Sequence, residues 1–164
     1  MARRQIRCHG DEKRFEAVAD FIYLRFGKSV RYIADVAGGR GLLSRYLNKK
    51  HNYDAEVIDP RGYALCGVPS RQTEYKTEMA MYYDLIVGLH PDGATREIVE
   101  SAAFRPVLVV PCCNEWDRET KLDARGLIIS IVSFLTERGI PCETVELDFK
   151  GPKNVGIVTG YRSI

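Results

Sequence analysis

The chain has 164 residues, a formal net charge of +2 and a hydrophobic content of 45%. This length suits one domain that buries roughly two-thirds of the surface of its unfolded chain, and the charge permits a nucleic-acid partner without requiring one. Because no apolar stretch reaches the roughly 18 residues of a membrane span and no signal-peptide core follows the first residues, we expect a cytoplasmic protein with no membrane partner.

Apolar spacing and turn residues predict the elements of the first two-thirds of the chain. A first helix is expected to begin after an N-cap at Asp11 and to stop at Gly27. It belongs to an N-terminal region (1–30) that precedes a core sheet (31–164), all in a single domain over residues 1–164. Apolar runs then predict strands at 32–36, 56–59, 71–75 (weak), 83–89 and 106–110, with helices at 41–50 and 95–103.

The last third of the chain predicts a helix at 122–138 and two strands, 143–149 and 155–161. Only the five residues Lys-Gly-Pro-Lys-Asn join these strands, whereas a parallel crossover needs about a dozen or more. We therefore expect an antiparallel hairpin there. Strands that are almost wholly apolar and alternate with helices are typical of a parallel sheet covered on both faces, so the fold class is a doubly wound, Rossmann-like α/β fold.

The turn between the first strand and the second helix reads Asp-Val-Ala-Gly-Gly-Arg-Gly over residues 35–41. Glycines let a ligand approach the backbone closely, and the helix that follows directs free amides and its positive dipole end at the turn. Gly38, Gly39 and Gly41 are expected to supply the close approach, and Asp35 to accept a hydrogen bond from a ligand ammonium. These features predict an adenosine cofactor.

The strand at 56–59 supports this interpretation because it ends in Asp59. A carboxylate at the end of the second strand can accept hydrogen bonds from both hydroxyls of a ribose. The alternative is a tight turn that happens to be followed by a surface aspartate.

With the terminal hairpin, the turn at 35–41 and Val57–Asp59 resemble class I S-adenosylmethionine-dependent methyltransferases over residues 31–161. The resemblance implies a seven-stranded sheet, mostly parallel with an antiparallel C-terminal strand, and S-adenosyl-L-methionine as cofactor. Ala37 stands where the family has its first glycine, so we expect a different loop path with binding retained. The cofactor-binding residues implied are Asp35 at the methionine amine, Ala37, Gly38, Gly39, Gly41, Asp59 at the ribose, Glu74 at the adenine, and His90.

Two further segments are similar to a branch of this family that includes tRNA 2′-O-methyltransferases. Residues 84–93 match its Asp-x-x-x-Gly-x-His-x-Cys-Gly segment, and residues 110–113 match its Pro-Cys-Cys. Asp92 stands where that branch has a cysteine. The similarity makes RNA the expected methyl acceptor, with a small molecule or a protein as alternatives.

His90 and Asp92 are the candidate catalytic residues, because each could remove a proton from an acceptor at the end of the fourth strand. The alternatives are that His90 hydrogen-bonds the loop backbone and that Asp92 caps its turn. Cys112 and Cys113 are expected to be reduced apolar fillers rather than nucleophiles. A zinc site of His90 with both cysteines is the alternative, but no metal is expected, because adjacent cysteines rarely reach one ion together.

Two other classes of protein remain open from the sequence. One is a non-catalytic subunit with a methyltransferase fold that binds RNA or a partner, which the altered first glycine favours. The other is a nicotinamide dehydrogenase, which requires a parallel final strand. Since no recognition domain is evident, we also expect a homodimer, a partner subunit or a compact substrate.

Overall fold

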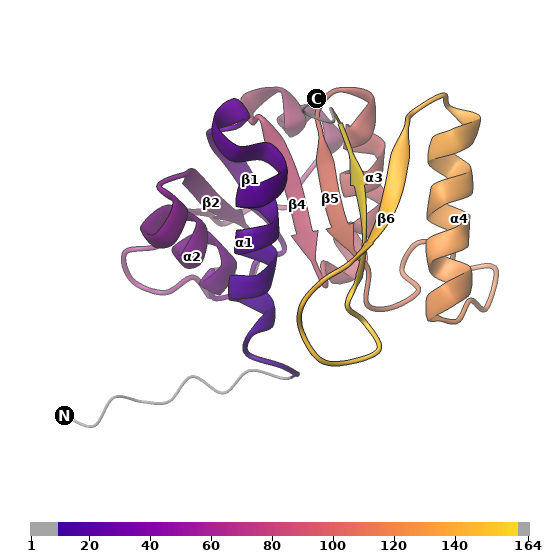
Figure 1. Cartoon of the computed structure of the whole chain (residues 1–164), viewed down its shortest axis with the longest axis horizontal. Coiled ribbons are helices and arrows are strands. Elements are labelled where there is room, and N and C mark those ends of the chain that lie inside the picture. Colours follow the sequence, from indigo (N-terminus) through magenta and orange to yellow (C-terminus); the bar gives the residue numbers. More distant parts are fainter. Residues whose placement is uncertain (1–9, 161–164) are drawn as a thin grey trace.

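The computed structural model describes residues 10–160, and the strands in this range form one seven-stranded sheet in the order β3-β2-β1-β4-β5-β7-β6. The first five strands pair in parallel, and β7 is antiparallel to both β5 and β6 (Figure 1). This arrangement confirms the doubly wound fold and the antiparallel terminal hairpin. The strands are β1 (Tyr32–Val36), β2 (Asp54–Ile58), β3 (Ser70–Arg71), β4 (Leu85–Leu89), β5 (Val107–Val110), β6 (Cys142–Glu146) and β7 (Val155–Thr159).

Helices cover both faces of the sheet, as the apolar strands predicted. Helices α1 (Arg14–Phe26) and α2 (Leu42–His51) lie in front of it in Figure 1, and α3 (Thr95–Glu100) lies behind it, packed on β4 and β5. Helix α4 (Ala124–Glu137) packs on the same layer as α3. The connections also contain the 3-10 helices η1 (Gly27–Ser29), η2 (Thr77–Tyr82), η3 (Asp92–Ala94) and η4 (Ser101–Ala103).

The central strand β4 shows why the strands read as continuous apolar runs. Leu85 and Val87 belong to the core layer beneath α1 and α2, whereas Ile86 belongs to the layer beneath α3 and α4. Successive side chains of a strand point to opposite faces, so a strand covered on both faces needs an apolar residue at every position. All five residues of β4 are accordingly buried.

Several predicted boundaries were wrong. The third strand is only Ser70–Arg71, both exposed, instead of 71–75, because a short edge strand has no buried face to impose an apolar pattern. Strand β6 ends at Glu146, after which Leu147 and Phe149 turn into the core beneath α1. The helix expected at 95–103 is divided into α3 and the 3-10 helix η4.

Asp11 is not the N-cap of the first helix. That position belongs to Lys13, which makes no side-chain capping bond. Asp11 instead accepts hydrogen bonds from the backbone N–H of Lys13 at 3.0 Å and of Lys150 at 2.8 Å. It therefore ties the segment before α1 to the loop between β6 and β7. Gly27 ends α1 as predicted, with φ of +51°.

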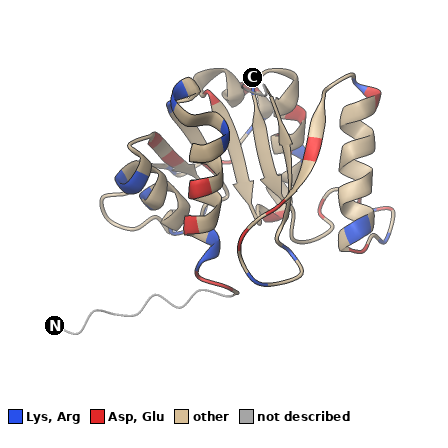
Figure 2. Cartoon of the chain, in the orientation of Figure 1, with Lys and Arg blue, Asp and Glu red and all other residues tan. Residues whose placement is uncertain are grey.

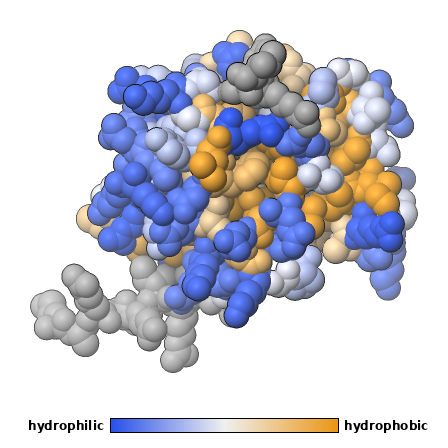
Figure 3. Space-filling model, in the orientation of Figure 1, coloured by the Kyte–Doolittle hydropathy of each residue, from blue (hydrophilic) through white to orange (hydrophobic). Residues whose placement is uncertain are grey.

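The surface carries both signs of charge, interspersed over the helices and loops (Figure 2). Figure 3 shows hydrophobic residues reaching the surface between α1 and α4. Within residues 10–160, no helix is both long and apolar enough to cross a bilayer.

Candidate functional site

A cavity of about 530 Å³ lies at the carboxyl ends of β1, β2 and β4. The chain leaves β1 toward β2 on one side, while β4 pairs with β1 on the other, so the sheet order reverses here. Ligands of open α/β sheets bind at such a switch point, and the volume is in the range of about 300–1,000 Å³ that is typical of small-molecule sites. The lining includes Ile58, Asp59, Arg61, Glu74, Tyr75 and Asp92.

A second cavity, of about 640 Å³, lies around Pro106 at the opposite, amino end of β5. Its wall includes the ion pair between Arg25 and Glu143. Although this cavity is larger, it lies away from the switch point and contains none of the residues that the sequence singled out. We therefore place the candidate site in the smaller one.

The loops around the smaller cavity hold unusual backbone conformations. Within the described part of the chain, four non-glycine residues have positive φ: Ala37 (53°), Asn52 (60°), His90 (52°) and Asp92 (48°). Asn52 ends α2, but the other three follow β1 and β4 at the cavity. Such conformations cost energy and concentrate at functional sites.

Hydrogen bonds from Arg61 and from Gly39 of the glycine turn fix the carboxylate of Asp59. Its Oδ2 accepts from the Gly39 N–H at 3.0 Å and from Arg61 Nη2 at 2.7 Å, while Oδ1 accepts from Nε and the backbone N–H of Arg61. Burial opposes the charge of Asp59, but the hydrogen bonds from Arg61 and Gly39 outweigh it and hold the pKa of this carboxyl below its ordinary value. Asp59 is thus an ionised carboxylate on the cavity wall.

Asp35 lies beneath the glycine turn and does not line the cavity. Its Oδ2 accepts from the hydroxyl of Ser44 at 2.8 Å and from the Ser44 N–H at 3.2 Å, in the first turn of α2. Burial raises the pKa of Asp35 to about 6, with a further contribution from the charge of Asp59 and against the hydrogen bonds from Ser44. In this structure Asp35 joins β1 to the start of α2.

The three glycines of the turn differ in what they do. A Cβ on Gly38 would lie 2.6–2.7 Å from the carboxyl atoms of Asp35, and one on Gly41 would lie 2.6 Å from a methyl of Val68. Internal packing therefore requires both glycines. Gly39 has φ of +57°, and a Cβ there would meet only Arg61, at 3.8 Å. Among the three, Gly39 is the one with open space beside it, although none of the three is among the residues that line the cavity.

The other predicted residues divide between the cavity and its surroundings. Ala37, Glu74 and Asp92 line the cavity, and Glu74 forms an exposed pair with Lys76 at 3.5 Å. His90 is not among the lining residues. Its Nε2 lies 2.9 Å from the carbonyl of Lys153, and burial lowers its pKa. The structure thus brings Ala37, Asp59, Glu74 and Asp92 together around one space.

Comparison with known proteins places the fold. No family model and no curated protein sequence matches the chain. Solved structures do match, among them the sugar N-methyltransferase KedS8 from Streptoalloteichus sp., with a TM-score of 0.58, 16% identity and 99% of each chain covered. The tRNA methyltransferase TrmK from B. subtilis matches with a TM-score of 0.55 and 15% identity, over 90% of this chain and 64% of TrmK. A SAM-dependent methyltransferase from Archaeoglobus fulgidus matches with a TM-score of 0.54 and 12% identity, over 88% of this chain and 93% of that protein. The chain has the fold of S-adenosylmethionine-dependent methyltransferases.

In this methyltransferase fold, the sequence interpretation missed two residues that shape the site. Arg61 covers the carboxylate of Asp59, and Ser44 satisfies that of Asp35. The sequence does contain a signal for Arg61, because it is a cation that stands two residues after the acid at the end of a predicted strand. It contains no such signal for Ser44, because the role of Ser44 depends on how α2 packs against the end of β1.

Proposed function

We propose that this chain is an S-adenosylmethionine-dependent methyltransferase. It binds its cofactor in the cavity of about 530 Å³ at the carboxyl ends of β1, β2 and β4 and transfers the methyl group to RNA. One observation carries the proposal. In a methyltransferase fold, the buried carboxylate of Asp59 and the glycine turn meet at the switch point, joined by the hydrogen bond from Gly39 to Asp59. A carboxylate at this place can accept hydrogen bonds from the hydroxyls of a ribose.

The residues present fit an adenosine group. Ile58, Pro60 and Ala94 give the cavity apolar walls on which a purine can pack, and Tyr75 adds a buried aromatic ring. Asp59 is only 2% exposed, so hydrogen bonds to its oxygens are made away from bulk water. Arg61 now holds these oxygens, but its side chain is 46% exposed and has solvent into which it can move.

The cofactor would supply an electrophilic methyl group, and the chain's own residues would supply position and charge. Asp59 accepts hydrogen bonds from the ribose hydroxyls, and Gly39 leaves the backbone open to close approach. Asp92 lies on the cavity wall with its side chain exposed, where a carboxylate can accept the proton of an acceptor hydroxyl or amine. His90 holds the loop that carries Asp92 through its contact with the Lys153 carbonyl.

Three cations at the cavity support RNA as the acceptor. Arg61, Lys76 and Arg96 all line it and are exposed, and such groups contact phosphates. Tyr63 is 62% exposed, with the Arg61 guanidinium 5.6 Å from its ring centroid, so it is available to stack on an unpaired base. A second copy of the chain or a partner subunit would extend the surface available to a long RNA.

The second candidate is a non-catalytic subunit with a methyltransferase fold. The pairing of Arg61 with Asp59 favours it, because the guanidinium occupies the oxygens that a ribose would use. In that case Arg61 stays paired with Asp59, and the protein acts by binding RNA or another chain.

Calorimetry with S-adenosylmethionine, followed by a tritiated-methyl assay on cellular RNA and protein fractions, tests the proposal. We expect binding by the full chain, a loss of about tenfold or more in Asp59→Asn, and label in RNA. Asp54→Asn is the matched control, because Asp54 lies at the far end of β2 and pairs with Arg31. Absence of cofactor binding together with tight RNA or protein binding would establish the non-catalytic alternative, and label in protein alone would exclude RNA as the acceptor.

A further inference from the structure

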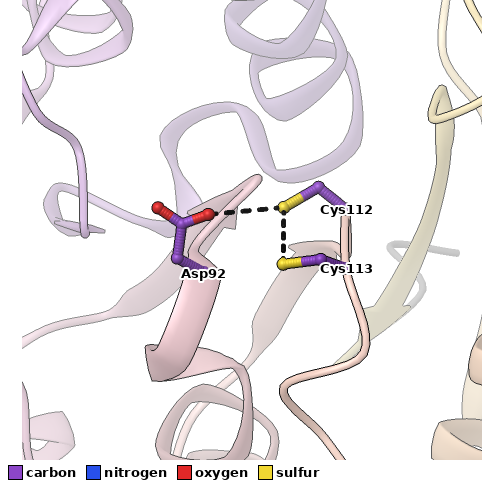
Figure 4. Close-up of side chains that lie close together, drawn as sticks. All are labelled: Asp92, Cys112 and Cys113. Atoms are coloured by element: carbon purple, nitrogen blue, oxygen red, sulfur yellow. Dashed lines mark hydrogen bonds between the residues drawn. The ribbon is translucent and has the colours of Figure 1, made fainter. Parts of the chain in front are cut away.

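A cluster of three metal-ligating side chains lies beside the cavity. Asp92 follows β4, and Cys112 and Cys113 follow β5, the neighbouring strand (Figure 4). The Sγ atom of Cys112 lies 3.6 Å from Asp92 Oδ1 and 3.5 Å from the Sγ atom of Cys113. All three donor atoms lie within 4.8 Å of one another. Figure 4 shows the three side chains directed at a common space.

These separations match the edges of a tetrahedral zinc site. Bonds of about 2.3 Å to sulfur and about 2.1 Å to oxygen, at tetrahedral angles, place two sulfurs about 3.8 Å apart and a sulfur and an oxygen about 3.6 Å apart. The two contacts of Cys112 therefore need to change by only a few tenths of an ångström. The objection that adjacent cysteines rarely reach one ion together does not apply here, because both thiols already point the same way.

The loop after β4 holds Asp92 in this place at an energetic cost. His90 and Asp92 both have left-handed backbones, and Pro91 between them is buried against β4. Strain in such a loop points to a function for the side chain that it presents. The same loop turns His90 away to the Lys153 carbonyl, so the third ligand beside the cysteines is Asp92 and not the histidine.

We propose that Asp92, Cys112 and Cys113 bind a zinc ion at the edge of the cavity. Two thiolates with one carboxylate form a donor set that zinc accepts, and three protein ligands leave a fourth position open. As the ion binds, each thiol loses its proton to the buffer and forms a metal–sulfur bond, and the carboxylate forms a metal–oxygen bond as an anion. Two protons are released, no oxidant or reductant is needed, and the group carries a net charge of −1.

The site shares Asp92 with the proposed methyl transfer, and a zinc-bound Asp92 would not also accept the proton of the methyl acceptor, but the site is separate from the residues proposed to bind the cofactor. Its ligands come from the loops after β4 and β5, whereas the ribose carboxylate Asp59 follows β2. Zinc binding can therefore be measured without cofactor or acceptor. Absence of zinc binding leaves the proposed cofactor site standing, and absence of cofactor binding leaves the zinc site standing.

The test uses the full chain, reduced with a phosphine and freed of metal, and titrated with Co²⁺ as a spectroscopic probe and then with Zn²⁺. We expect the near-ultraviolet band of thiolate-to-cobalt charge transfer at one ion per chain, displaced by Zn²⁺ with release of two protons. Cys112→Ser and Cys113→Ser should each lose the band, and Asp92→Asn should bind at least roughly tenfold more weakly. Cys66→Ser is the control, since Cys66 is an exposed free thiol outside the cluster.

A second measurement needs no variant. Bound Zn²⁺ should protect Cys112 and Cys113 of the wild-type chain from alkylation while Cys66 reacts at its usual rate, as read by peptide mass spectrometry. A cobalt band that persists in both serine variants, equal loss of the band in Cys66→Ser, or alkylation of Cys112 and Cys113 that is insensitive to Zn²⁺ would each overturn the proposal.

Discussion

The guanidinium of Arg61 lies across the carboxylate of Asp59, with Nη2 2.7 Å from Oδ2 and Nε 3.0 Å from Oδ1. These are the oxygens that a ribose would use. The side chain of Asp59 is buried and that of Arg61 is about half exposed, so of the two partners Arg61 is the one with room to move. Binding of the proposed cofactor would therefore compete with an internal ion pair within the loop after β2.

Arg61→Ala should tighten binding of S-adenosylmethionine about fivefold. The variant removes the competitor for Asp59, and a partly exposed ion pair contributes ~1 kcal/mol. Calorimetry of wild type and variant at the same salt concentration measures the change. Arg40→Ala is the control, because Arg40 is an exposed cation of the glycine turn, whereas the carboxylate of Asp59 is held by Gly39 and Arg61. Weaker binding in Arg61→Ala would instead show that the guanidinium contacts the cofactor directly.

Asp35→Asn should raise the stability of the protein above pH 6. The pKa of Asp35 is about 6 in the folded chain and about 3.9 in an unfolded one, so the folded state binds this proton more tightly. Its contribution to stability is therefore lost as the pH rises from about 4 through 6, a change of about 2–3 kcal/mol. The asparagine oxygen can still accept both hydrogen bonds from Ser44.

Thermal unfolding between pH 4 and 8 tests whether Asp35→Asn stabilises the protein at the higher pH. Wild type and Asp35→Asn should converge near pH 4 and separate above pH 6, with the variant melting higher. Asp35→Ala is the comparison that removes the acceptor altogether, and it should be destabilised at every pH because the buried Ser44 donors lose their partner. If the asparagine variant were as unstable as the alanine variant at pH 8, the charge of Asp35 itself would be needed.

Gly88→Ala should destabilise the fold by about 1–3 kcal/mol and displace the loop that carries Asp92. A Cβ at Gly88 would lie 2.5 Å from Ile98 Cδ1 and 3.1 Å from Pro91 Cβ and Cγ. Gly156→Ala in β7 is the matched buried glycine, where the nearest atom is 3.3 Å away. Chemical denaturation should rank the wild type, Gly156→Ala and Gly88→Ala in order of falling stability. Equal losses of stability in the two variants would show that the side chain of Ile98 can move aside without an energetic cost.

The central part of the fold could be predicted because burial on both faces leaves a clear trace in the sequence. Leu85–Leu89 and Val107–Val110 are apolar at every position and were recognised as strands. Ser70–Arg71 is a strand only because its backbone pairs with β2, and its exposed side chains carry no such trace. The antiparallel hairpin was predictable from the length of its connection alone, even though β6 ends earlier than expected.

The site was predictable in position more than in detail. Asp59 lies where the end of an apolar strand placed it, at the cavity. Asp35 is the penultimate residue of β1, and its side chain turns under the loop to Ser44. His90 and Asp92 are two residues apart, yet left-handed backbone at both sends one to Lys153 and the other to Cys112. Such directions depend on loop dihedral angles, which residue type constrains weakly outside glycine and proline.

Ala37→Gly should stabilise the protein by about 1 kcal/mol, because Ala37 has φ of 53° and a left-handed residue with a Cβ costs about 1–2 kcal/mol. Part of that gain is offset by the greater freedom of glycine in the unfolded chain. Ala34→Gly is the same chemical change in the extended backbone of β1, where it should destabilise instead. Chemical denaturation of the two variants should therefore give opposite signs. A loss of stability in Ala37→Gly would mean that contacts of the Ala37 methyl group outweigh the strain, and that the alanine is retained for the shape it gives the cavity wall.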